Sequence, residues 1–253
     1  MKRILKKIAI VSGWLLFIAF LAATLSFSSR ETEGIECRDI EVRYAGNQTI
    51  RLGKNELARM VRSADPHIIG KKLTDINTGA IETKVARHKA ILKADLYKNI
   101  VRDSTGYKGV VTLKVKHRVP VVRVISSQGN YYIDKEGNRI PVSVSYAADV
   151  PVATGNITAG MAEKELLPLV EFIQDNRFWK AQIKQIHFND RGDILMTTLV
   201  GGQVIEFGST ENMEEKFRNL RAFYDQVMTP HNWNKYNRII LKFNNQVIAK
   251  KNR

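Results

Sequence analysis

The stretch IAIVSGWLLFIAFLAATLSF, Ile8–Phe27, contains no charged residue and decides how the rest of the chain is laid out. A helix of about 20 apolar residues, rising about 1.5 Å per residue, matches the roughly 30 Å hydrocarbon core of a bilayer. A helix on the surface of a soluble domain would instead carry a polar face. We therefore expect residues 8–27 to form a transmembrane helix.

The charges around this stretch predict its orientation. Four positive residues and no acid precede it, namely Lys2, Arg3, Lys6 and Lys7. By the positive-inside rule, residues 1–7 are then a cytoplasmic tail, residues 28–35 are a linker, and the bulk of the chain lies outside the cytoplasm. The alternative is a cleaved signal peptide, since Ser26-Phe27-Ser28 offers a small-x-small site, but the apolar run exceeds the usual 7 to 15 residues of such peptides. Both alternatives export the remainder.

Composition limits what the exported part can be. The chain has a formal charge of +15, and its first 30 residues supply five positive charges and no acid, which leaves +10 for the remainder. A basic exported surface meets anionic lipid head groups or acidic wall polymers, and the sequence lacks the interleaved aromatic and basic residues typical of nucleic-acid binding. Cys37 is the only cysteine, so the fold depends on its hydrophobic core and not on an internal disulfide.

The segment after the linker predicts a small α+β module. Cys37–Tyr44 alternates as a strand, and Gly53–Ser63 and Asn77–Lys89 have apolar residues at helical spacing. Leu92–Tyr97 and Val111–Lys116 alternate again, with a turn between them, so we expect an antiparallel pair of strands. The order strand, helix, helix, strand, strand is complete in about 80 residues.

The rest of the chain predicts a second, larger domain of mainly antiparallel sheet with flanking helices. Turn residues separate its strands, and Asn212 with Glu215 resembles a capping box at the start of the last helix. Pro168 is expected to kink the first helix or to start a second one. The expected strands are 121–126, 131–133 with a hairpin turn at 136–138, 150–155, 183–189, 194–200, 204–207 and 236–250; the expected helices are 161–178 and one beginning at 212.

Three motifs carry a resemblance to a known family. The strand-helix-helix-strand-strand order after an anchor resembles a polypeptide-transport-associated (POTRA) domain. His117–Val124, HRVPVVRV, resembles the "QR.P..RV" junction of the FtsQ/DivIB cell-division family, with His117 in place of the usual Gln, and Tyr131–Pro141 resembles its "Y.D..G...P" stretch. The resemblance covers essentially the whole chain and implies a POTRA-like domain at 36–117 and a C-terminal β domain at 118–253.

What the resemblance implies is a scaffold of the bacterial inner membrane, with a single pass and a cytoplasmic N-terminus. Such a protein joins the small single-span division proteins FtsB/DivIC and FtsL at the septum, while its POTRA-like domain serves recruitment. The alternative from another class is a POTRA-type periplasmic chaperone or secretion and assembly factor that binds extended polypeptides.

The last predicted strand is the candidate partner-binding site. A terminal strand at a sheet edge presents unpaired N–H and C=O groups, and a partner can add a strand there. By the resemblance, Phe243 and Lys242 match an aromatic and a basic residue of the family's terminal strand. The simpler alternative is a strand that only completes the sheet. The expected partner-binding residues are Tyr236, Ile240, Lys242, Phe243, Asn245, Gln246, Val247, Ile248 and Ala249.

The sequence offers no pattern for catalysis. Its five histidines are scattered without a second ligand at metal-binding spacing, and it contains no P-loop, no G-x-S-x-G and no G-x-G-x-x-G. Asp190 and Asp193 flank Gly192 and read as turn formers. We therefore expect no enzyme, no catalytic residue, no metal, no cofactor, no small-molecule substrate and no nucleic-acid partner.

Overall fold

The computed structural model describes residues 12–21, 34–104, 106–228, 233–243 and 246–252. Residues 12–21 form a helix, whereas 8–11 and 22–27 of the predicted transmembrane segment lie outside the described residues. Within the described ranges, no helix is both long and apolar enough to cross a membrane. The chain divides into two compact units, one comprising Met1–Gly46 with Gly53–Lys116 and the other Asn47–Leu52 with His117–Arg253.

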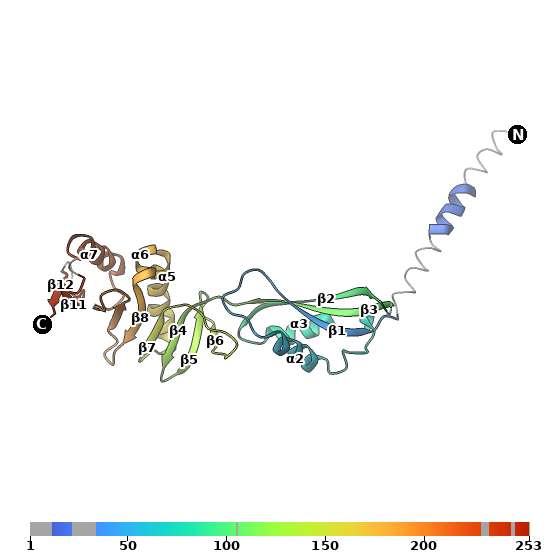
Figure 1. The fold of residues 1–253 in the computed structure, drawn as a ribbon, viewed down its shortest axis with the longest axis horizontal. Coiled ribbons are helices and arrows are strands. Elements are labelled where there is room, and N and C mark those ends of the chain that lie inside the picture. The colour runs from blue at the N-terminus through green and yellow to red at the C-terminus, as the bar shows by residue number, and fades with distance from the viewer. Residues whose placement is uncertain (1–11, 22–33, 105, 229–232, 244–245, 253) are drawn as a thin grey trace, which may run out of the picture. The chain divides into compact units, whose positions relative to one another are not determined.

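The first unit has the predicted α+β order and a three-stranded sheet in the order β1-β3-β2. Strand β1 runs parallel to β3, and α2 and α3 lie on the same face of the sheet (Figure 1). Its elements are β1 (Cys37–Tyr44), α2 (Lys54–Ala64), the short 3-10 helix η1 (Leu73–Asp75), α3 (Thr78–Ala86), β2 (Ile91–Asp103) and β3 (Gly106–His117).

Local sequence explains the elements of this unit. Leu57 and Val61 of α2 and Ile81 and Val85 of α3 are buried, as the helical spacing predicts. Asn77 begins α3, since its side-chain oxygen accepts a hydrogen bond from the backbone N–H of Ala80 at 3.0 Å. Strands β2 and β3 continue well beyond the predicted alternating segments, which makes a hairpin much longer than expected.

The second unit contains a nine-stranded mixed sheet in the order β12-β11-β10-β9-β8-β7-β4-β5-β6. The meander β8-β9-β10 is antiparallel as predicted, whereas β7 is parallel to both β4 and β8, and β10 is parallel to β11. The strands are β4 (Pro120–Ser126), β5 (Gly129–Asp134), β6 (Arg139–Pro141), β7 (Val152–Gly155), β8 (Ile183–Phe188), β9 (Ile194–Thr198), β10 (Val204–Gly208), β11 (Tyr236–Ile240) and β12 (Ile248–Lys251).

The helices of this unit correct one prediction about the segment 161–178. The helices are α4 (Ala159–Met161), the π-helical turn η2 (Ala162–Leu166), α5 (Leu167–Asp175), α6 (Arg177–Gln182) and α7 (Met213–Gln226). Pro168 lies in the first turn of α5, where its missing N–H costs little, and a wider π turn precedes it. This agrees with the expectation that Pro168 starts a second helix. The expected end at residue 178 is wrong, because the chain breaks at Asn176, whose side chain accepts from the N–H groups of Phe178 and Trp179 and so begins α6.

The predicted capping box at the start of α7 is wrong. Asn212 adopts a left-handed backbone conformation, with φ of 51°, and its side chain makes no capping hydrogen bond. An N-cap residue that accepts from the first turn needs an extended backbone, which this conformation does not provide. Asparagine is among the few residues that tolerate the left-handed region, so it serves here as the corner between β10 and α7.

The core of the second unit, which is mostly aliphatic, contains an aromatic cluster between α5, α6 and α7 and one face of the sheet (Figure 1). The Phe217 ring stacks on Phe172 at 4.6 Å and lies 5.0 Å from Phe207 and 5.3 Å from Trp179. Tyr224 packs edge-on to Trp179, and its burial raises the pKa of its hydroxyl to about 12. This cluster holds α7 beside β10 and the last strands.

Residues 47–52 are joined to the second unit through His117. The N–H of Leu52 donates to His117 Nε2 at 3.1 Å, so Nδ1 carries the ring proton of the neutral imidazole and donates to Gln48 Oε1 at 2.5 Å. His117 is buried, which explains why both ring nitrogens are paired. The residue that departs from the family's usual Gln therefore tethers a loop from far earlier in the sequence.

Candidate partner-binding site

The C-terminal segment does not form the single long strand that the sequence predicted at 236–250. It forms two antiparallel strands, β11 (Tyr236–Ile240) and β12 (Ile248–Lys251), and the described residues between them, 241–243 and 246–247, belong to neither. The predicted alternation also fails, because Ile239, Ile240 and Leu241 are all buried. Two adjacent asparagines, residues 244 and 245, lie between the strands in sequence and are outside the described residues; asparagine favours turns, and this signal was available.

Strand β12 is the last strand at one edge of the nine-stranded sheet, and its outward backbone groups can be assigned. The Asn252 N–H donates to the Lys235 carbonyl at 2.9 Å, so Lys250, two residues earlier, also faces β11. On the far side of β11, the Leu241 N–H donates to the Glu206 carbonyl of β10. Ile240, one residue earlier, therefore faces β12, which agrees with the assignment of Lys250 to the β11 side. The N–H and C=O groups of Ala249 and Lys251 therefore point away from the sheet.

Two of the predicted partner-binding residues lie on the inner strand β11. Tyr236 packs against Phe223 of α7, with ring centroids 5.6 Å apart, and Ile240 is only 9% exposed. Both support the sheet beneath β12. Neither lies on the strand that forms the edge.

Lys242, another predicted partner residue, makes an ion pair within the fold. Its Nζ lies 2.6 Å from Oδ2 of Asp193, in the turn between β8 and β9. The hydrogen bond from Lys242 holds the pKa of Asp193 below its usual value. The lysine therefore fastens the segment after β11 to a neighbouring hairpin turn.

The remaining predicted residues lie at or beside the edge. Phe243 is 56% exposed and, with Gln246, lines a small hollow of about 10 Å³ at the start of α7. Ile248 is exposed on β12, while Val247 and Ala249 are half-buried. Asn245 lies outside the described residues. The structure thus brings an open strand edge and an exposed aromatic ring into one region.

An unpredicted ion pair links two of the motifs. Asp134 is 1% exposed and accepts from Arg118 Nη1 at 2.8 Å, from the Asn138 N–H at 2.7 Å and from the Asn138 side chain. Arg118 belongs to the HRVPVVRV junction and Asp134 to the Tyr131–Pro141 stretch. The sequence signal for this ion pair is that each of its residues belongs to one of the two motifs. Asp134 needs the Arg118 partner because a buried carboxylate without one is costly.

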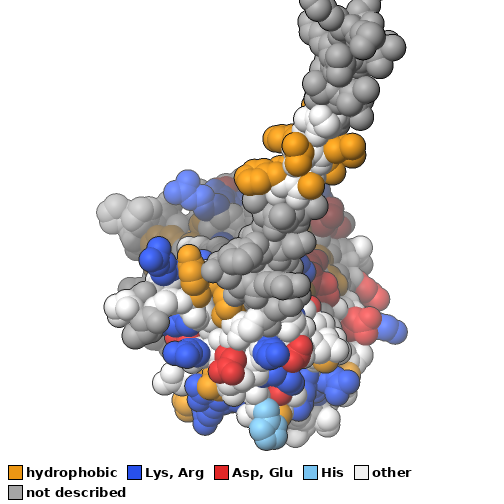
Figure 2. All heavy atoms as spheres, turned by 90° about the vertical axis from the view of Figure 1, so that its right-hand side faces the viewer, with side chains coloured by type: hydrophobic (Ala, Val, Ile, Leu, Met, Phe, Trp, Pro, Cys, Tyr) orange, Lys and Arg blue, Asp and Glu red, His pale blue; other side chains and the backbone are white. Residues whose placement is uncertain are grey.

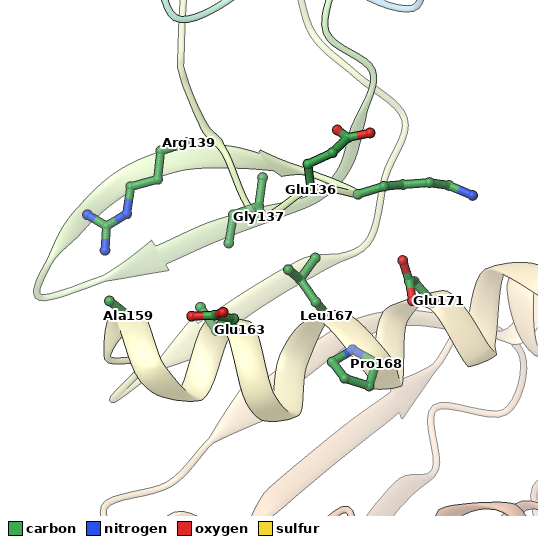
Figure 3. A pocket seen from close by; sticks show the side chains of 11 residues that line it. Glu136, Gly137, Arg139, Ala159, Glu163, Leu167, Pro168 and Glu171 are labelled. Carbon is green, nitrogen blue, oxygen red and sulfur yellow. The ribbon is translucent and has the colours of Figure 1, made fainter.

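A second hollow lies between the β5–β6 hairpin and the helical segment from α4 to α5 (Figure 3). Its volume is about 510 Å³, and Gly137 of the hairpin faces Leu167 across it, with Glu163 and Glu171 on the helical side. Its lining contains no serine, threonine, cysteine or histidine, so its only side chains with nucleophilic groups are carboxylates and Lys135. Among the described residues, no cluster of three His, Cys, Asp or Glu is arranged to hold a metal.

The two units together define the class of protein. The first unit has the β1-α2-α3-β2-β3 order of a POTRA-like domain, and the POTRA-like domain model matches residues 34–102. The family model described as "FtsQ/DivIB, C-terminal related" matches residues 119–250, more than half of the chain. The chain belongs to the FtsQ/DivIB family.

Curated relatives agree with this assignment. The chain is 27% identical over 227 residues to a protein named "Cell division protein FtsQ" from Rhodothermus marinus, covering 80% of this chain and 78% of that protein. It is 25% identical over 185 residues to a protein of the same name from Salinibacter ruber, covering 67% and 68% of the two chains.

Proposed function

We propose that this protein is a cell-division scaffold that binds small single-span division proteins, of the FtsB/DivIC and FtsL types, by strand addition to the outer edge of β12. The observation that carries the proposal is the open edge itself. Within the described part of the chain, no strand pairs with the outer side of β12, and the Ala249 and Lys251 backbone groups point outward. A partner strand would satisfy these groups and would extend the sheet.

Side chains around the edge supply specificity. Ile248 and Lys250 alternate with Ala249 and Lys251 along β12, so an added strand would meet an apolar and a basic residue on one face and a small and a basic residue on the other. The exposed Phe243 ring lies five residues before β12 in the sequence and offers an apolar surface to a partner side chain. This combination favours a short extended segment over a folded domain.

The apolar stretch 8–27 completes the proposal. As a transmembrane helix with its N-terminus in the cytoplasm, it would tether both units at the outer face of the bacterial inner membrane. Partners that span the membrane once would then approach by diffusion in two dimensions, which raises their effective concentration. The proposed role is binding and not catalysis.

Two neighbouring proline substitutions test the edge. Ala249→Pro removes an outward N–H and is expected to weaken capture of an FtsB/DivIC-type partner about five- to tenfold, because it leaves one ladder bond unmade and places a ring at the interface. Lys250→Pro removes an inward N–H and is expected to loosen β12 from β11. Partner affinity is measured by titration with the purified partner in detergent, and the unfolding free energy by urea denaturation.

The pair is informative because the two residues are adjacent. Ala249→Pro is expected to keep its unfolding midpoint while losing affinity, and Lys250→Pro to lose stability. Unchanged affinity in a folded Ala249→Pro protein would exclude pairing at this edge. A photoreactive residue at Ile248, compared with one at Val142 beside the opposite sheet edge, gives an independent position test, and equal crosslinking at both sites would also contradict the proposal.

A further inference from the structure

The β2–β3 hairpin of the POTRA-like unit carries exposed apolar residues at its far end. Tyr107 is 62% exposed, Ile100 44% and Val101 43%. Ile100 and Val101 are consecutive in β2, so their side chains point to opposite faces of the hairpin. The end of the hairpin is thus apolar on both faces, which differs from a sheet that covers one core and exposes one polar face.

Basic residues are frequent in the sequence at this end. Lys98, Arg102 and Lys108 lie within residues 98–108, against one acid in that range, Asp103. The Arg102 guanidinium lies 5.8 Å from the centroid of the Tyr107 ring. Tyrosine with neighbouring arginine and lysine is the composition that proteins place at a membrane–water interface, where the ring meets the head groups and the cations meet phosphate.

The hairpin end lies where the chain arrives from its apolar stretch. The Gly109 N–H donates to the Glu36 carbonyl at 3.0 Å, and Cys37 and Ile35 bond to the backbone of residues 71 and 73. Gly109 permits this approach, because a Cβ there would lie 2.6 Å from the Glu36 carbonyl oxygen. Residues 35–37 are therefore held beside the hairpin, three residues from the start of β3.

The remaining distance to the membrane is short. Residues 28–34 between the apolar stretch and this anchoring point can span at most about 25 Å when extended. Strand β3 continues from Gly109 back to Gly106, about 10 Å beyond the anchoring point. Figure 2 shows one face of the molecule, on which Lys and Arg side chains are interspersed with acidic and apolar ones.

We propose that the end of the β2–β3 hairpin inserts into the anionic head-group layer of the membrane that holds the chain. This inference rests on the transmembrane anchor of the proposed function. The occupant is a phospholipid surface, because apolar side chains on both faces of a narrow hairpin suit a medium that surrounds it, and three basic residues suit anionic phosphate. Such a contact gives the POTRA-like unit a second attachment point, so that it lies against the bilayer.

The test measures the depth of the hairpin in the full-length chain. Ser104, exposed in the hairpin turn, is replaced by cysteine and spin-labelled in a Cys37→Ala background, which removes the only native thiol. The matched control is a label at Lys114, exposed farther along β3. Both proteins are reconstituted into vesicles of phosphatidylglycerol and phosphatidylcholine, and collision with oxygen and with a water-soluble nickel chelate is measured by electron paramagnetic resonance.

We expect the Ser104 label to be about threefold less accessible to nickel than the Lys114 label, and more accessible to oxygen. Ile100→Ser with Tyr107→Ser is expected to abolish the difference. Arg102→Gln is expected to weaken the insertion about fivefold, and only when phosphatidylglycerol is present, since one basic residue near an anionic surface is worth about that factor.

The outcomes separate this inference from the proposed function. Equal nickel access at both labels, in chains that resist carbonate extraction, would leave the anchor intact and overturn the hairpin insertion. Release of the chain by carbonate would remove the anchor, and the inference would fall with it. Spin–spin broadening at Ser104 would show a second copy of the chain at the hairpin and would also overturn the lipid assignment.

Discussion

The two edges of the nine-stranded sheet differ in how they end. At one edge, the short strand β6 contains Pro141, and the Tyr146 hydroxyl donates to the Pro141 carbonyl. At the other edge, β12 has no proline, and the outward groups of Ala249 and Lys251 have no pairing strand among the described residues. We call the β6 edge, which contains Pro141, the closed end of the sheet, and the β12 edge, with the outward groups of Ala249 and Lys251, the open end.

The direction of the backbone hydrogen bonds shows why β6 offers few free groups to another strand. The Asp134 N–H donates to the Asn138 carbonyl, so β5 faces β6 at Asp134 and Tyr132, and Tyr132 is paired with Ile140. Ile140 therefore faces inward and Pro141 outward. The outward donor is missing at Pro141 and the outward acceptor is occupied, which are two ways in which proteins protect an edge strand. β12 lacks both of these devices, although it is a short strand that carries Lys250 and Lys251. In the proposed function, its outward backbone groups accept a partner strand.

The largest expected effect comes from removing the support that lies beneath the open end. Phe217→Ala is expected to lower the unfolding free energy by about 3–5 kcal/mol, because Phe217 is 2% exposed and its ring fills the space between α7 and the sheet. The matched control, Phe243→Ala, truncates an exposed ring and is expected to change stability by less than about 0.5 kcal/mol. Urea denaturation measures both. Similar losses in the two variants would contradict the contrast between core and edge.

A second prediction opens the closed end. Pro141→Val with Tyr146→Phe restores an outward donor and frees an outward acceptor on β6. We expect edge-to-edge self-association to strengthen about fivefold, equivalent to about 1 kcal/mol for one backbone hydrogen bond, with Pro141→Val alone intermediate. Sedimentation velocity measures the dimer fraction. A double variant that stays as monomeric as the parent would show that these two residues do not protect the edge.

The smallest expected effect concerns the ion pair behind the open end. Lys242→Ala is expected to cost about 0.5 kcal/mol at neutral pH, since both partners are partly exposed. Lys242 lowers the folded-state pKa of Asp193, so its contribution is present above the unfolded pKa and is lost as the pH falls through the folded value. The parent and the variant should therefore converge in stability in acid, once the pH is below the folded-state pKa of Asp193. A gap that persists there would show that packing, and not charge, is lost.

Much of the fold follows from local sequence. The alternation in Cys37–Tyr44 predicted β1 with its observed bounds, and the turn around Gly137 was found because glycine adopts its positive φ of 81° without strain. The order of the first unit and the antiparallel meander of the second were predicted from periodicity and turn residues. In each case the signal and the structure involve the same few neighbouring residues.

The failures have a common physical cause. Ile239, Ile240 and Leu241 are apolar in a row, and only neighbours on both faces of the sheet can bury all three, so alternation did not apply. The strand break before β12 depended on the pairing of β12 with β11. Lys242 forms an ion pair with Asp193, which is 49 residues away in sequence. Residues proposed for the partner were thus partly used by the fold itself.

The sequence by itself determined the apolar stretch, the two-domain order, the family motifs and most elements, because hydrophobic periodicity and turn chemistry are local properties. Only the tertiary structure decided which strand forms each edge, which backbone groups point outward, and which apolar residues stay exposed beside the point where the chain enters its first domain. These properties depend on strand pairing between distant segments. Whether a backbone N–H is paired depends on which strand lies beside it in space, and the local sequence does not specify that neighbour.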